Sequence, residues 1–198
     1  PAKRIVEAGE TVREGQLIGK AVGAGSANIH SPIPGVVQDI RRIPDVSGGY
    51  VEAVTVALEG AFERLGRKTE VFPWRGLSKH QILRTIADKG VVEDDGSGIP
   101  LYDRLNDPKG LRPSCVLVVN CIESDPWNHS ASAILVGRAA ALQEGIEILK
   151  RVLSPSRTIL ATDAESLDAF CAVPAQEGDK PEILVFEPRY PQDLSSLL

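Results

Sequence analysis

The second half of the chain alternates short apolar runs with helical stretches, and this alternation constrains the fold more than any other feature. Residues 115–119 form a continuous apolar run rich in β-branched side chains, which is typical of a strand buried on both faces. Residues 130–153 repeat apolar side chains at helical spacing. Two further strands, 158–161 and 182–186, flank a short helix over 163–170. Strand, helix, strand, helix, strand predicts right-handed crossovers and a parallel sheet in a three-layer α/β domain.

The first 60 residues have a different pattern, in which short apolar segments are separated by glycines and by a Ser-Pro turn at 31–32. Residues 36–40 and 50–58 are strand candidates. We therefore expect a small all-β domain over residues 1–60, a connection over 61–76, and the α/β domain over 77–198. The connection is placed where prolines, glycines and charges interrupt both patterns.

The sequence indicates where a helix over residues 78–89 begins and where it ends. Ser78 and Gln81 have the spacing of a capping box, and Gly90 is the glycine that commonly follows a helix C-terminus. The segment that follows, 90–105, therefore begins directly at the end of this helix.

Segment 90–105 contains a short glycine loop. Gly96, Ser97 and Gly98 carry little or no side chain, so their backbone N–H groups could approach an anion, and Pro100 stiffens the exit of the loop. A Gly-Ser-Gly-x-Pro turn is also common in ordinary surface loops, and both interpretations remain open from the residues alone.

Three consecutive acids, Glu93, Asp94 and Asp95, precede these glycines. Their negative potential would oppose a phosphate at the loop, by about 1 kcal/mol per close pair even in water. They cannot all face one cation without a special turn, so no metal site is predicted there.

Polar side chains follow the first strand of the predicted sheet. Asn120, Glu123 and Asp125 come directly after it, where open parallel sheets bind their ligands. Acids at a strand end also cap helices, and Asp125 with Pro126 could simply begin the helix at residue 130. No catalytic residue can be assigned, because His129 has neither a nucleophile nor an orienting partner nearby in the sequence.

Composition excludes several classes of function. The 22 Lys and Arg residues are scattered among 27 Asp and Glu, with a net charge of −5, so no nucleic-acid partner is expected. No apolar run approaches the ~20 residues of a membrane span. The 3 cysteines never form a C-x-x-C pair, so we expect no disulfide framework, no zinc site and no iron–sulfur cluster in this chain.

Three motifs together resemble the RnfC family, which comprises the C subunits of Rnf-type electron-transport complexes. The core of these subunits is similar to the NADH-oxidising flavoprotein of respiratory complex I. The family pattern G-[IV]-V-G-x-G-G-A-G-F-P-x-x-x-K-L lies over residues 90–105 without a gap, its N-x-x-E-x-E-P-Y segment resembles 120–127, and its Y-P-Q-G resembles 190–193. The resemblance implies a Rossmann-like α/β domain. In this chain acids stand at 93, 95 and 193, where the family has glycines.

The N-terminal glycine pattern and its S-P-x-x-G-x-V sequence resemble the barrel-sandwich hybrid of lipoyl and biotinyl domains, which the RnfC family shares. Those carrier domains join their cofactor to a lysine at the end of a hairpin. Residues 21–44 contain no lysine, so we expect no covalent lipoate or biotin. The β-domain is expected to serve packing or contact with other subunits.

The resemblance also implies a function. FMN would bind along residues 96–100, with Asn120, Glu123 and Asp125 around its ribityl chain and the nicotinamide of NADH, which would donate a hydride. The partners would be other subunits of a membrane electron-transport complex, with this chain peripheral on the cytoplasmic side of the inner membrane. We further expect residues upstream of Pro1, and iron–sulfur clusters in a region after Leu198.

The same residues support an alternative. A non-catalytic relative that keeps the scaffold and loses the flavin site, acting in assembly or docking, would show intact core patterns and altered cofactor glycines. The acids at 93 and 95 fit that description.

Overall fold

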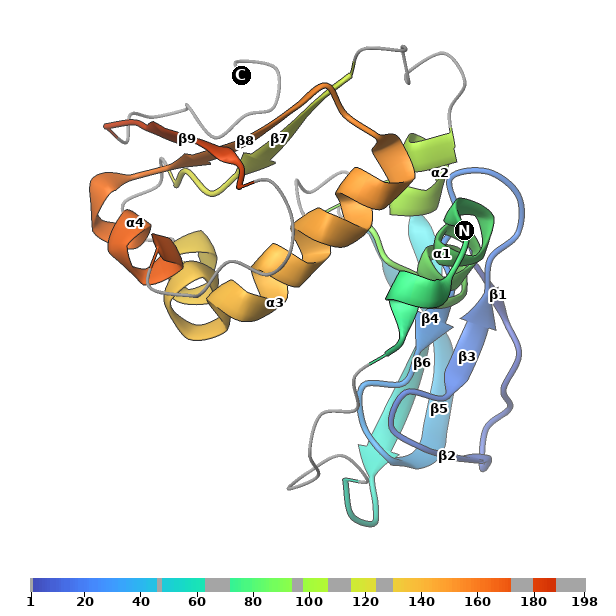
Figure 1. The fold of residues 1–198 in the computed structure, drawn as a ribbon. Coiled ribbons are helices and arrows are strands. Elements are labelled where there is room, and N and C mark those ends of the chain that lie inside the picture. Colours follow the sequence, from blue (N-terminus) through green and yellow to red (C-terminus); the bar gives the residue numbers. More distant parts are fainter. Residues whose placement is uncertain are drawn as a thin grey trace. The chain divides into compact units, whose positions relative to one another are not determined.

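The computed structural model describes residues 2–45, 48–62, 72–93, 98–106, 115–123, 130–171 and 180–187. They divide into two compact units (Figure 1). The first unit comprises residues 1–76 and 84–104, and the second comprises residues 77–83 and 105–198. The division crosses the first long helix after Leu83.

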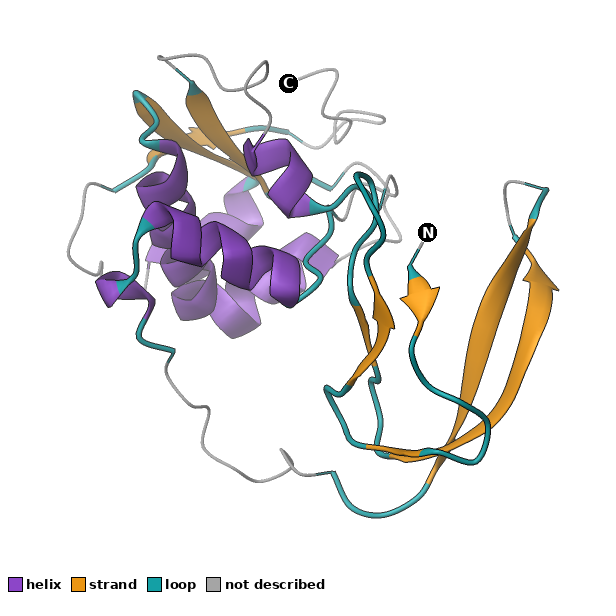
Figure 2. Cartoon of the chain, turned by 90° about the vertical axis from the view of Figure 1, so that its right-hand side faces the viewer, coloured by secondary structure: helices purple, strands orange, loops and turns teal. Residues whose placement is uncertain are grey.

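Two small antiparallel sheets build the first unit (Figure 2). One has the strand order β1-β3-β4 and the other the order β2-β5-β6. The strands are β1 (Lys3–Arg4), β2 (Thr11–Val12), β3 (Leu17–Lys20), β4 (Ile29–His30), β5 (Gly35–Pro44) and β6 (Tyr50–Leu58). The strand predictions at 36–40 and 50–58 correspond to β5 and β6, which pair along their whole length as a hairpin.

A compact apolar cluster holds these sheets together. Val6, Val12, Ile18 and Val37 are buried, and Val37 has no exposed surface. Three side chains from β5 and β6 pack against them, namely Ile40, Val54 and Val56. Burial of each such side chain stabilises the unit by about 1.5–3 kcal/mol.

Helix α1 (Lys79–Asp88) begins and ends as its sequence predicts. Gln81 N–H donates to Ser78 Oγ at 3.3 Å and Ser78 N–H donates to Gln81 Oε1 at 2.8 Å, which confirms the capping box. At the other end, Gly90 N–H donates to the Ala87 carbonyl and Val91 N–H to the Ile86 carbonyl. This is a Schellman motif, with Gly90 in the left-handed region at φ +66°.

The second unit contains the predicted parallel sheet. Strands β7 (Val116–Asn120), β8 (Arg157–Thr162) and β9 (Glu182–Val185) pair in that order, all parallel. Helices α3 (Ser130–Leu153) and α4 (Ala164–Cys171) connect them and lie on the same side of the sheet (Figure 1). Two right-handed crossovers between successive neighbours require that arrangement.

The core of this unit lies between the sheet and α3. Cys121, Leu135, Ile146 and Leu160 form its buried centre, and Val119, Ala131 and Leu142 pack against it. Helix α3 is interrupted by a kink at Arg138, directly after Gly137, where the missing side chain weakens the helix. Among the described helices, none is long and apolar enough to cross a membrane.

Two glycines in regular elements should respond oppositely to alanine substitution. A Cβ on Gly35 in β5 would lie 1.9 Å from the Ala57 carbonyl oxygen, whereas a Cβ on Gly145 in α3 would meet no atom within 4 Å. We expect Gly35→Ala to lower the free energy of unfolding by about 1–3 kcal/mol, because the strand must move. Gly145→Ala should raise it by about 0.5–1 kcal/mol. Urea unfolding followed by circular dichroism measures both, and a fully stable Gly35→Ala variant would contradict the β5–β6 register.

Candidate functional site

The ends of the glycine loop are joined as a short antiparallel stem. Val92 and Pro100 form an isolated bridge, Glu93 N–H donates to the Ile99 carbonyl at 2.9 Å, and Leu101 N–H donates to the Val91 carbonyl at 2.9 Å. We call residues 90–93 and 98–101 the loop stem. Of the predicted site residues, Gly96 and Ser97 lie outside the described residues, as do Asp94 and Asp95.

Gly98 and Pro100 lie on the returning side of the stem. Gly98 has φ +63°, and a Cβ there would meet nothing within 4 Å, so the space beside it is open. Pro100 is buried, and its carbonyl accepts the N–H groups of Asp103 and Arg104. It therefore starts helix α2 (Leu101–Asn106) directly at the end of the loop.

Glu93, one of the acids at a family glycine position, is paired with Arg104. Arg104 Nε donates to Glu93 Oε1 at 2.8 Å, and a terminal guanidinium nitrogen donates to Oε2 at 2.9 Å. The Glu93 side chain is only 19% exposed. Since the pair is bidentate, Arg104 offsets the negative charge that Glu93 brings to the stem.

The carboxyl edge of the parallel sheet presents the second group of predicted residues. Asn120 ends β7, and its Oδ1 accepts the Ile122 N–H at 3.1 Å. The Glu123 carboxylate accepts the backbone N–H of Ala131, together with the hydroxyls of Ser130 at 3.3 Å and Ser132 at 3.4 Å. Glu123 therefore caps the N-terminus of α3, where a negative charge is favourable. Asp125 lies outside the described residues.

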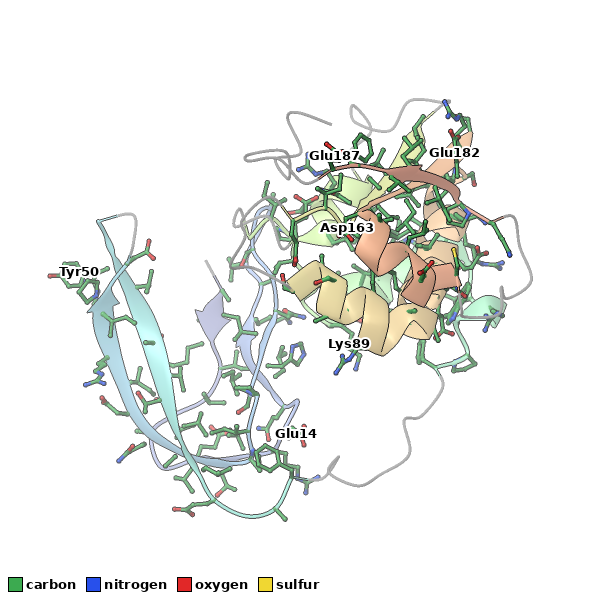
Figure 3. All side chains as sticks on the ribbon, turned by 90° about the vertical axis from the view of Figure 1, so that its left-hand side faces the viewer. Glu14, Tyr50, Lys89, Asp163, Glu182 and Glu187 are labelled. Carbon is green, nitrogen blue, oxygen red and sulfur yellow. The ribbon has the colours of Figure 1, made fainter. Side chains whose placement is uncertain are left out.

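Cys121 directly follows β7 at this edge. Burial raises the pKa of its thiol to about 11, and the negative charges of Asp163 and Glu123 add to the increase. The thiol is therefore neutral near pH 7 and is a poor nucleophile or metal ligand there. Figure 3 shows Asp163 and Glu187 toward one end of the sheet and Glu182 at the other.

One residue of this edge was not predicted from the sequence. Thr162 is the last residue of β8, the middle strand, and has no exposed surface. Within the described part of the chain, its hydroxyl has no hydrogen-bond partner. A buried polar group without a partner is costly, and such groups in native proteins call for a ligand, a water or a special role. The only signal in the sequence was its position, one polar residue after an apolar strand.

The residues that the structure describes include no group of three or more His, Cys, Asp or Glu side chains that could hold a metal ion.

Comparisons with known proteins match both units. Residues 1–61 match the RnfC barrel sandwich hybrid domain, and residues 86–197 match the Nuo51 FMN-binding domain. The second match covers more than half of the chain. Together with the observed sheets, the two matches confirm the predicted fold class, a barrel-sandwich hybrid followed by an α/β domain with a parallel sheet.

Curated relatives are subunits of redox complexes. The C subunit of an ion-translocating oxidoreductase complex from Pseudomonas aeruginosa is 32% identical over 96% of this chain and 25% of its own length. The C subunit of a proton-translocating ferredoxin:NAD(+) oxidoreductase complex from Clostridium ljungdahlii is 25% identical over the whole chain and 43% of its own length. The corresponding protein of the Na(+)-translocating complex from Acetobacterium woodii is 22% identical over 97% of this chain.

This chain thus spans between a quarter and less than half of the length of these relatives. The two domain matches occur in the order that the N-terminal glycine pattern and the motif at 90–105 suggested. The chain therefore belongs to the Nuo51 FMN-binding domain family, in the RnfC type that joins this domain to a barrel sandwich hybrid.

Proposed function

We propose that this chain binds FMN and takes part in the entry of electrons from NADH into an Rnf-type complex. The observation that carries the proposal is the Nuo51 FMN-binding domain match over residues 86–197, which includes the loop stem and all three parallel strands. The names of the relatives, which are NAD(+)-linked oxidoreductase subunits, support NADH as the donor.

The loop stem has features that suit a flavin phosphate. Gly98 leaves open space beside the backbone, and the charge of Glu93 is offset by Arg104. Acids in a glycine loop would otherwise repel a phosphate. The bidentate pair removes part of that objection, because it leaves the stem with little net charge at this position.

The edge of the parallel sheet also suits a polar ligand. Thr162 offers a buried hydroxyl that lacks a partner among the described residues, and Asn120 ends the neighbouring strand. Ligands of open parallel sheets bind beyond the carboxyl ends of the strands. We propose Thr162 and Asn120 as the residues with which the second unit would hold the flavin.

The protein would position the cofactor, and the cofactor would supply the redox chemistry. FMN, when bound, accepts a hydride from NADH and releases electrons one at a time. The chain's own part is to hold the phosphate at the stem and to donate the Thr162 hydroxyl. Cys121, whose pKa is raised to about 11, stays protonated and takes no covalent part.

We also propose the assembly that the relatives' names suggest. The chain would join other subunits of a membrane complex and sit at its cytoplasmic side, attached through those subunits. Iron–sulfur clusters and a covalent lipoate or biotin are proposed to be absent from this part of the protein, which would pass electrons to clusters held elsewhere.

One observation favours a second candidate. The Glu123 carboxylate, which the family resemblance assigns to the cofactor, is engaged by the N-terminus of α3. A relative that retains the scaffold only for assembly would use Glu123 in this way. Flavin binding decides between the two candidates.

The first prediction of the proposed function is therefore that the chain binds FMN. Titration of the purified chain with FMN should quench the flavin fluorescence with micromolar or tighter affinity. Anaerobic addition of NADH should then bleach the absorbance of the bound flavin. No binding at millimolar FMN would overturn the proposal and leave the assembly role; binding without bleaching would leave a flavoprotein that NADH does not reduce.

The charge balance at the stem gives a second prediction. Arg104→Ala leaves Glu93 uncompensated, so FMN affinity should fall about five-fold at low salt. Glu93→Gln leaves Arg104 uncompensated and should raise the affinity by a similar factor. Both effects should shrink as salt screens the charges. Arg84→Ala is the matched control, since it also removes one exposed cation, from the Arg84–Asp88 pair on α1. Equal effects from Arg84→Ala and Arg104→Ala would point to net charge alone.

Thr162 gives a third prediction, in which a substitution changes FMN affinity without lowering the stability of the fold. Thr162→Val keeps the side-chain shape and removes the hydroxyl, so FMN affinity should fall about five-fold while the melting temperature stays constant or rises. Thr158→Val, on the same strand and face but partly exposed, should change neither quantity. A lower melting temperature with unchanged FMN affinity would show that the hydroxyl serves the fold.

A further inference from the structure

The connection between β3 and β4 is ordered by its own hydrogen bonds. Ala21 N–H donates to Asn28 Oδ1 at 2.9 Å and Val22 N–H donates to Ser26 Oγ at 3.2 Å. Gly23 and Gly25 both adopt positive φ, which lets the chain turn tightly between these contacts. We call residues 21–28 the tip loop.

The tip loop contacts the segments on both sides of the loop stem. Asn28 Nδ2 donates to the Asp88 carbonyl at 3.2 Å, at the end of α1. Gly25 N–H donates to Asp103 Oδ2 at 2.7 Å, in α2. These contacts join residues that are 60 and 78 positions apart in the sequence.

The tip loop also meets the backbone at Gly90. A Cβ on this residue would lie 2.0 Å from the Asn28 carbonyl oxygen, so the two backbones touch where the helix ends and the stem begins. Around this contact lies an open pocket of about 450 Å³, which is lined by the tip loop on one side and by Gly90, Pro100 and Tyr102 on the other.

Both strands of the stem are therefore anchored to the tip loop. Asp88 and Gly90 lead into the first strand, and Asp103 follows the second. The neighbour of Asp103, Arg104, returns to Glu93 in the stem. Through these contacts the tip loop restrains the loop stem.

We infer that the tip loop is a positioning element for the loop stem, with Asn28 and Asp103 as positioning residues. The inference rests on the proposed function insofar as the glycine loop binds FMN. The core cluster of the β-sheets, Val6, Val12, Ile18 and Val37, includes none of these residues. Loss of an exposed hydrogen bond favours local opening of the structure, which requires less free energy than global unfolding.

Two variants, Asn28→Ala and Asp103→Ala, test the inference by amide hydrogen exchange. The Glu93 and Leu101 N–H groups, which join the stem, should exchange about five-fold faster. The Val37 N–H, which donates to the Glu10 carbonyl in the β-domain, should keep its rate and so report that the fold is intact. FMN affinity should fall by a similar factor in both variants.

Two matched variants sharpen the test. Asp103→Asn retains an acceptor oxygen for Gly25 N–H and should restore most of the slow exchange and of the FMN affinity. Glu52→Ala breaks the exposed Arg4–Glu52 pair in the same unit and should leave both quantities unchanged.

The outcomes separate this inference from the proposed function. Unchanged exchange at Glu93 and Leu101 overturns the inference. Faster exchange with unchanged FMN affinity also overturns it, because the stem would move without consequence for the ligand. If the unaltered chain binds no FMN, the proposed function fails, and exchange alone then decides whether the tip loop positions the stem.

Discussion

The contact between the Gly90 and Asn28 backbones is the constraint on which the loop stem depends. Only a residue without a side chain can end α1 there, because φ is +66° and the Asn28 carbonyl occupies the place of a Cβ. A helix stop is thus also a point where distant chain segments meet. The Schellman motif and the stem both include Gly90, and the tip loop contacts it through Asn28, so a change at position 90 would disturb all three.

Electrostatics at the stem depend on pairing more than on composition. Taken singly, the acids at 93–95 argue against a phosphate nearby. The bidentate Arg104–Glu93 pair lowers the net negative charge at the stem. Arg104 stands at the lysine position of the family pattern, and it neutralises Glu93, which stands at a glycine position. The main effect of this pair on the stem is on the local electrostatic potential.

Much of the fold was predictable because its signals are local. Ser78, Gln81 and Gly90 fix the ends of α1 through contacts within a few residues. The parallel order of β7, β8 and β9 follows from alternating strands and helices. Several contacts of the candidate site were not predictable, since they join residues whose proximity depends on register: Arg104 with Glu93, Gly25 with Asp103, and Glu123 with the start of α3. The isolation of the Thr162 hydroxyl likewise depends on what surrounds it in three dimensions.

The burial of Cys121 has a consequence for chemical durability. Oxidants attack a thiol as its thiolate and where it is accessible. Cys121 is 6% exposed and its pKa is about 11, so it is protected on both counts. Cys171, exposed at the end of α4, lacks the shielding of burial. Oxidative damage would thus begin at the surface of the second unit and spare the sulfur in its core.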